Sequence, residues 1–165
     1  MTAPILVLGW GNLSRGDDAL GPLCVAALHD SLPASMGSLV EFLDDHQLNL
    51  EHALDLTGRT RVLLIDASLT CRPPFEVTLL QPEQDDSFTT HTLSPQALLH
   101  IYQNLHDMPP PHCTLLAIRG SAFELGTPPG SAALDHLDSA LQWARAWLTG
   151  TTDTGCDCDL RGCLD

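Results

Sequence analysis

Short apolar runs alternate with segments of helical periodicity along the first 150 residues. Runs with the length and residue types of β-strands occupy residues 5–9, 38–43, 61–66, 75–80 and 113–118. Apolar residues recur at helical spacing in a segment that begins near residue 17 and in segments 48–56, 94–105 and 131–148. Because strands and helices alternate, we predict an α/β fold with a mostly parallel sheet covered by helices on both faces.

Two of the predicted helices carry specific start signals. The first is expected to begin at Asp17 or Asp18, with Pro22 in its first turn, where a missing N–H does little harm. Ser94 is expected to cap the helix over 94–105, with Pro95 at its first helical position. These signals fix where loops end and helices begin.

The chain is expected to contain one α/β domain, residues 1–150, followed by a polar tail, residues 151–165. The tail lacks helical or strand periodicity, and we expect it to be flexible. Its thiols, Cys156, Cys158 and Cys163, could bind a soft metal, but no fourth ligand accompanies them. We therefore interpret them as incidental.

Composition and charge exclude some classes of partner. The formal net charge is −14, from 21 acidic and 7 basic residues. Such a charge repels phosphate backbones, so we expect no nucleic-acid partner. No apolar segment approaches the length of a membrane span, and the first residues lack a basic start and a cleavage site. We expect a cytoplasmic protein whose thiols are reduced, with no membrane partner.

Three polar side chains follow predicted strands at the edge where α/β sheets bind ligands. Asp18, next to Asp17, follows the first strand, Asp66 ends the third, and His91 lies in the loop after the fourth. Ligands of open α/β sheets bind outside the carboxyl ends of the strands, near the switch in strand order. We therefore expect two carboxylates and one imidazole to meet there.

Each of these residues also has a purely structural interpretation. An aspartate at a helix start often caps the helix, and we assign that role to Asp17, which leaves Asp18 for function. Asp66 could instead hydrogen-bond a turn. His91 could be an ordinary polar loop residue.

Two other chemistries fit the sequence less well. The loop after the first strand begins like the dinucleotide motif G-x-G-x-x-G, but Ser14 replaces the third glycine, and two acids lie where a pyrophosphate would bind. No lysine is placed as a P-loop requires. Cys71 lies beside a proline-rich turn with no histidine placed to activate it, which disfavours a cysteine protease.

Two carboxylates and an imidazole suit a divalent transition metal such as nickel or zinc. Three protein ligands leave coordination positions open for a partner. Alternatively, paired aspartates could activate water as a proton-sharing dyad. The residues alone leave both possibilities open.

Four ordered segments resemble the hydrogenase maturation endopeptidases. The first is Gly9-Trp-Gly-Asn with the acidic pair and a following glycine. The others are the strand end Leu-Ile-Asp66-Ala, the loop of His91 and the block at 118–126. The resemblance extends over residues 5 to about 148. The segment 44–51 also resembles the branch that serves soluble, NAD-linked hydrogenases.

The resemblance implies a three-layer sandwich with a twisted five-stranded sheet. It also implies a protease that removes a short C-terminal extension from the nickel-loaded large-subunit precursor of a [NiFe]-hydrogenase. The family's metal-contacting and catalytic set carries over to Asp18, Asp66 and His91, with nickel supplied by the substrate rather than permanently bound. Many relatives have glutamate where this chain has Asp18, whose side chain is one methylene shorter.

Two further expectations concern what the protein binds and how it acts. We expect it to act as a monomer on one folded partner. The alternative is a non-catalytic nickel-binding chaperone for the same precursor.

Overall fold

The computed structural model describes residues 1–84 and 93–150. Its strands within these ranges are β1 (Ile5–Trp10), β2 (Val40–Asp45), β3 (Arg61–Ser68), β4 (Phe75–Leu79) and β5 (His112–Arg119). The helices described there are α1 (Leu20–Ser31), α2 (His52–Asp55), α3 (Pro95–His106) and α4 (Ser131–Thr149), with short 3-10 helices η1 (Gly16–Ala19) and η2 (Ala34–Met36). The predicted α/β class is confirmed. The predicted tail, 151–165, and the histidine at 91 lie outside the described residues.

The strands form one sheet in the order β2-β1-β3-β5-β4 across the described chain. β2, β1, β3 and β5 run parallel, and β4 pairs antiparallel with β5 at one edge. The chain leaves β1 to form β2 on one side and returns to form β3 on the other side. The strand order therefore reverses between β1 and β3, and the ligand-binding crevice of such a sheet is expected there.

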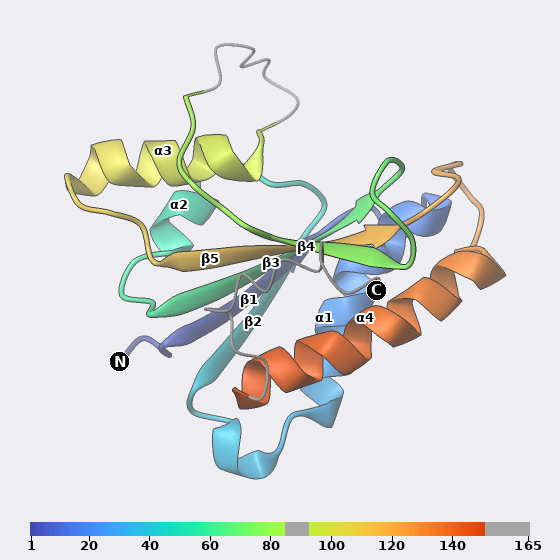
Figure 1. Ribbon diagram of the computed structural model, residues 1–165, viewed down its shortest axis with the longest axis horizontal. Coiled ribbons are helices and arrows are strands. Elements are labelled where there is room, and N and C mark those ends of the chain that lie inside the picture. Colours follow the sequence, from blue (N-terminus) through green and yellow to red (C-terminus); the bar gives the residue numbers. More distant parts are fainter. Residues whose placement is uncertain (85–92, 151–165) are drawn as a thin grey trace, which may run out of the picture.

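Helices cover both faces of the sheet, as Figure 1 shows. Alternate residues of a strand point to opposite faces, so Val7, Leu63 and Ile65 join α1 and α4 in one core. Leu8 and Leu64 join α2 and α3 in the other core. The predicted sandwich is thus present, with β1 and β3 buried on both faces.

The predicted start signals have different outcomes. Ser94 caps α3, since its Oγ accepts a hydrogen bond from the Ala97 amide at 3.1 Å, and Pro95 is the first helical residue. The segment from Gly16 is a single 3-10 turn, and α1 begins only at Leu20 without a side-chain cap. The prediction that Asp17 caps this helix is therefore wrong.

Strand β3 is longer than its apolar run predicts. It continues past Asp66 to Ser68 because β5 pairs with it as far as the partners Ser68 and Arg119. Asp66 thus lies inside the strand, two residues before its end, and the regular strand fixes the direction of its side chain.

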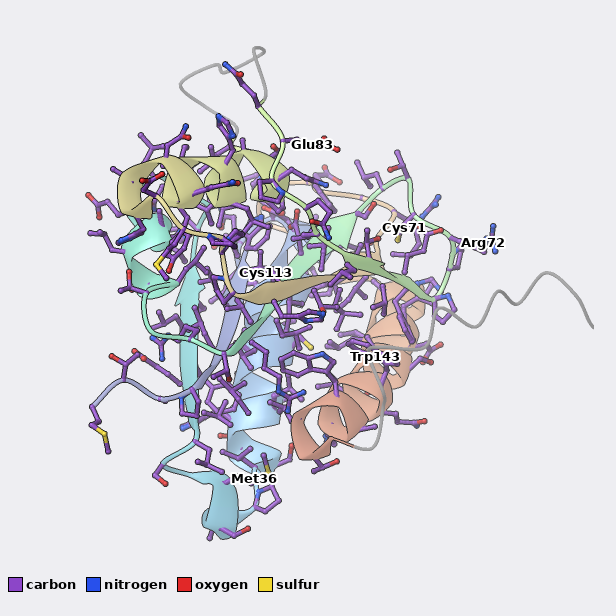
Figure 2. The ribbon with its side chains drawn as sticks, turned by 60° about the vertical axis from the view of Figure 1, so that its left-hand side comes forward. Met36, Cys71, Arg72, Glu83, Cys113 and Trp143 are labelled. Carbon is purple, nitrogen blue, oxygen red and sulfur yellow. The ribbon has the colours of Figure 1, made fainter. Side chains whose placement is uncertain are left out.

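The cysteines of the described chain are free thiols. Cys24 lies in α1, Cys113 in β5, and Cys71 in the loop that follows β3 (Figure 2). Cys71 is buried, and its thiol contacts the Ala117 carbonyl oxygen at 3.6 Å. This placement gives no support to a cysteine nucleophile. Among the described residues, no helix is long and apolar enough to cross a membrane.

Helix α1 comes unusually close to the sheet at its first turn, and this contact is testable. A Cβ on Gly21 would lie 2.4 Å from the Trp10 carbonyl oxygen and 2.9 Å from that of Ile65. Although alanine favours helices, Gly21→Ala must push α1 away from β1 and β3. We expect a loss of about 1–3 kcal/mol in the free energy of unfolding, measured by urea denaturation.

Gly37→Ala is the matched control. Its Cβ would meet only the Ala34 carbonyl oxygen, at 3.4 Å. We expect a change within about 0.5 kcal/mol. Equal losses from the two substitutions would contradict the close approach.

Candidate functional site

A pocket of about 450 Å³ opens at the carboxyl edge of the sheet, where the strand order reverses. Loops after β1, β2 and β5, the end of β3 and the start of α3 all contribute to it. Its wall includes the aromatic or aliphatic side chains of Trp10, Leu48, Leu93 and Phe123. Two carboxylates, Asp18 and Asp66, line the same space.

A tight turn after β1 places Asp18. Gly11 has φ 146°, and a Cβ there would lie 1.9 Å from the Asp18 carbonyl oxygen, so only glycine fits. The amide of Asn12 donates a hydrogen bond to Oδ2 of Asp18 at 2.9 Å. One oxygen of the half-buried carboxylate is therefore held by the backbone of the same loop.

Asp66 belongs to the strand itself. It lies two residues beyond Leu64 and so points to the sheet face that α2 and α3 cover. Burial, and to a smaller extent the charge of Asp18, raise the pKa of the Asp66 carboxyl to about 7, although hydrogen bonds from the Ala67 amide and the Trp10 side chain lower it. The two carboxylates are thus close enough to repel each other when both are ionised.

The third predicted site residue, His91, lies outside the described residues, but the chain on both sides of it is informative. The strand preceding it, β4, is antiparallel, so it ends at the opposite edge of the sheet. His91 therefore does not follow a strand that ends at the ligand-binding edge, contrary to the prediction. The chain nevertheless returns to that edge, because Leu93 and Pro95 line the pocket and the Glu83 amide donates to the Gln96 carbonyl at 3.2 Å.

Asp17 has a structural role that differs from the predicted helix cap. It is buried, and its carboxylate accepts hydrogen bonds from the amides of Ser121, Ala122 and Gly130 at 2.7, 3.2 and 2.8 Å. Burial raises the pKa of this carboxyl, but those donors and the nearby imidazole of His136 outweigh it and hold the pKa below its ordinary value. Asp17 therefore joins the loop after β1 to the loop after β5.

The sequence analysis missed several polar residues of the pocket, among them Arg15, His46 and Gln47. Segment 44–51 was noted there only for its resemblance to the branch that serves soluble, NAD-linked hydrogenases. The signal was available, because β2 is parallel to β1 and its following loop must emerge at the same edge. Applying the strand-end argument to β2 would have placed His46 at the site.

Within residues 1–84 and 93–150, no three His, Cys, Asp or Glu side chains gather as a metal-binding group. The described chain thus supplies the two oxygen ligands of the predicted set, while the imidazole of that set lies outside it. The assignment of Asp18, Asp66 and His91 as ligands stays a prediction.

Solved structures of several hydrogenase maturation peptidases share this fold. The hydrogenase maturating endopeptidase HybD from E. coli is 24% identical, with 89% of this chain and 93% of that chain covered and a TM-score of 0.68. The [NiFe] hydrogenase maturation protease HycI from Thermococcus kodakarensis is 18% identical, with coverages of 90% and 93% and a TM-score of 0.66. The hydrogenase 2 maturation peptidase from a Thaumarchaeota archaeon is 21% identical, with coverages of 90% and 99% and a TM-score of 0.62.

This likeness confirms the fold that the sequence resemblance implies, and these proteins carry the name of the family that the sequence resembles. No family model matches the sequence, and no curated protein matches it closely enough to count as a relative.

The different roles of the adjacent aspartates can be separated by isosteric substitution. In Asp17→Asn, the new NH2 group would face a backbone donor in either orientation, the Gly130 amide in one and the Ser121 and Ala122 amides in the other. We expect a loss of about 2–4 kcal/mol in the free energy of unfolding at neutral pH, measured by urea denaturation. Asp18→Asn keeps an oxygen for the Asn12 amide and is expected to change it by less than about 1 kcal/mol. Comparable losses would contradict the division of roles.

The raised pKa of Asp66 predicts a pH dependence of stability. Its pKa is about 7 in the folded protein against an ordinary 3.8, so its contribution to stability is fully present below pH 4 and lost as pH rises through 7. The free energy of unfolding of the wild type, relative to Asp66→Asn, should therefore fall between pH 4 and 7. The slope is at most about 1.4 kcal/mol per pH unit. A difference that stays constant with pH would show that Asp66 titrates normally.

Proposed function

We propose that this protein is an endopeptidase that removes a C-terminal extension from the nickel-loaded large-subunit precursor of a [NiFe]-hydrogenase. The observation that carries the proposal is the meeting of Asp18 and Asp66 in one pocket at the point where the strand order reverses. The fold of named maturation endopeptidases supports it, as does the sequence resemblance around both residues.

The electrostatics of the pocket favour a cationic ligand. The charge of Asp18 helps to raise the pKa of Asp66, which means that ionising both carboxylates costs free energy. A divalent cation between them would remove this cost, and carboxylate oxygens with an imidazole suit Ni²⁺. Nickel already bound in the precursor would be held by Asp18, Asp66 and His91, and would polarise the peptide carbonyl as a Lewis acid.

Peptide hydrolysis also needs groups that move protons. A water molecule that attacks a peptide carbonyl must lose a proton, and the departing amine must gain one. A carboxyl with a pKa of about 7, such as Asp66, can accept and return a proton near neutral pH. The backbone amide that holds Asp18 keeps the second carboxylate in a fixed orientation while the peptide binds.

The walls of the pocket suit an extended peptide. Trp10, Leu48, Leu93 and Phe123 give apolar surface on several sides of the carboxylates. The resemblance of residues 44–51 to the branch that serves soluble, NAD-linked hydrogenases falls on this wall, because His46, Gln47 and Leu48 belong to it. We propose that this loop contributes to the choice of precursor.

The function is tested by incubating the purified protein with nickel-loaded precursor and weighing the product by mass spectrometry. We expect a mass loss equal to a C-terminal peptide. Asp18→Ala, Asp66→Ala and His91→Ala should each slow cleavage by about 100-fold or more while thermal unfolding remains cooperative. The control is His112→Ala, an exposed histidine at the amino end of β5, which should cleave like the wild type.

Two outcomes would contradict the proposal in different ways. An unchanged precursor mass with stable binding would support the non-catalytic chaperone instead. Cleavage at the wild-type rate by all three site variants would show that these side chains are not the site.

A further inference from the structure

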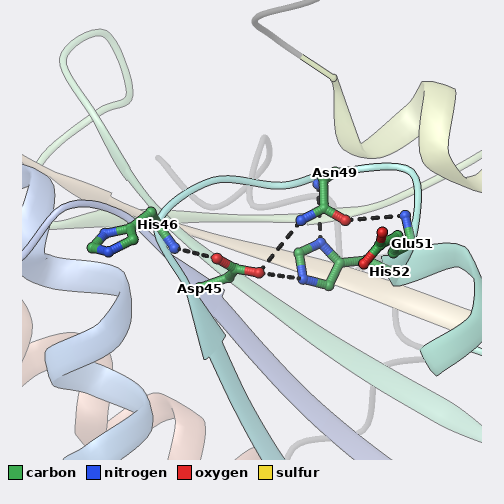
Figure 3. Close-up of polar contacts among 5 residues, drawn as sticks. All are labelled: Asp45, His46, Asn49, Glu51 and His52. Atoms are coloured by element: carbon green, nitrogen blue, oxygen red, sulfur yellow. Dashed lines mark hydrogen bonds and ion pairs between the residues drawn. The ribbon is translucent and has the colours of Figure 1, made fainter.

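The loop between β2 and α2 is held by a buried imidazole that the proposed chemistry does not use. The side chain of His52 is 8% exposed, and both of its ring nitrogens have partners. Nδ1 accepts a hydrogen bond from the Asn49 amide at 3.0 Å, and Nε2 lies 3.3 Å from Oδ2 of Asp45 (Figure 3). These partners fix the tautomer, because a nitrogen that accepts from an amide carries no proton and the other must then donate.

Asp45 joins this imidazole to the next residue of the loop. Its Oδ1 accepts a hydrogen bond from the His46 amide at 2.7 Å, while Oδ2 faces His52 and the Asn49 side chain, the latter at 3.4 Å. A turn of five residues, 45–49, is thus closed on itself by side chains. We call Asp45, Asn49 and His52 the loop clamp.

The loop clamp is also joined to the loop that carries Asp18. The Gly11 amide donates to the Asp45 carbonyl oxygen at 3.0 Å, and the next amide, of Asn12, donates to the Asp18 carboxylate at 2.9 Å. The backbone at Asp45 and the loop that carries Asp18 are thus bonded to each other. The bond from Gly11 is made to the main-chain carbonyl of Asp45, so it does not depend on the side chains of the loop clamp.

The loop clamp holds the backbone of His46, which lines the pocket. Figure 3 shows its ring on the opposite side of Asp45 from His52. The residue is exposed, yet it lines the same pocket as Asp18 and Asp66. An exposed side chain on an unsupported loop would sample many orientations, whereas the bond from its own amide to Asp45 restricts the backbone from which it extends.

We propose that Asp45 and His52 are positioning residues, which hold the turn so that His46 contacts the peptide substrate beside the two carboxylates. The inference rests on the proposed function. His46 would hydrogen-bond the backbone of the bound peptide, and the loop clamp would act on the reaction only through His46.

This dependence gives a test by double-mutant cycle. His46→Ala removes the substrate contact. His52→Asn keeps an oxygen for the Asn49 amide but is too short to reach Asp45, so it releases the clamp. Because His52 acts through His46, we expect His46→Ala to lower kcat/KM by about tenfold, the factor that corresponds to one hydrogen bond. His52→Asn should lower it by less, and the double variant should match His46→Ala alone.

Hydrogen exchange provides a readout that does not depend on cleavage. In His52→Asn, exchange of the His46 amide should quicken relative to the wild type, while amides in the centre of β3 remain protected. His112→Ala, the same control as above, should change neither the exchange at His46 nor kcat/KM.

Three results would overturn the inference. One is additive losses in the double variant, which would mean that His52 acts through general stability. Another is unchanged exchange at His46 on release of the clamp. The third is wild-type kcat/KM in His46→Ala. If the wild-type protein itself cleaves no precursor, the proposed function fails and this inference with it, whereas cleavage by the wild type and equally by His46→Ala overturns the inference alone.

Discussion

The fold holds two carboxylates in one pocket, where burial and, to a smaller extent, their mutual repulsion oppose the ionisation of Asp66. Asp18 and Asp66 are far apart in the sequence, but the chain forms β2 and β3 on opposite sides of β1, so the loop after β1 and the end of β3 meet. Burial and the neighbouring charge together raise the pKa of Asp66 to about 7. A cation bound between the two carboxylates would offset the free-energy cost of ionising both.

The surrounding structure serves to keep that costly arrangement in place. Both carboxylate oxygens of Asp17 accept hydrogen bonds from backbone amides of the loop after β5. Gly11 allows the loop after β1 to turn back on itself. Gly21 lets α1 lie directly on β1 and β3. These three residues take no part in the proposed chemistry but hold the loops and α1 in place. A preorganised site requires such support.

Sequence periodicity was sufficient for most of the fold, because β1 and β3 are continuous apolar runs and Ser94 with Pro95 marks a helix start by local chemistry alone. It could not reveal the direction of β4, since a short strand carries the same pattern whether it runs parallel or antiparallel. The expectation that His91 follows a parallel strand was wrong for that reason. The family resemblance, rather than the strand-end argument, therefore supports His91.

The roles of individual polar residues were harder to predict than their positions. Asp17 and Asp18 are identical in type and adjacent, and only the distant amides that meet Asp17 distinguish them. His52 likewise resembles an ordinary helical residue in the sequence, because its partner Asp45 belongs to the preceding strand. Long-range partners of this kind leave no periodic signal.

The proposed docking of nickel between Asp18 and Asp66 can be measured by paramagnetic broadening with Ni²⁺. The side-chain carboxyl signals of the protein would be followed by carbon-13 NMR as Ni²⁺ is added. We expect the signals of Asp18 and Asp66 to broaden together, at nickel concentrations that leave the signal of Asp107, at the C-terminal end of α3, sharp. Broadening of Asp107 and other exposed acids before Asp18 and Asp66 would contradict it.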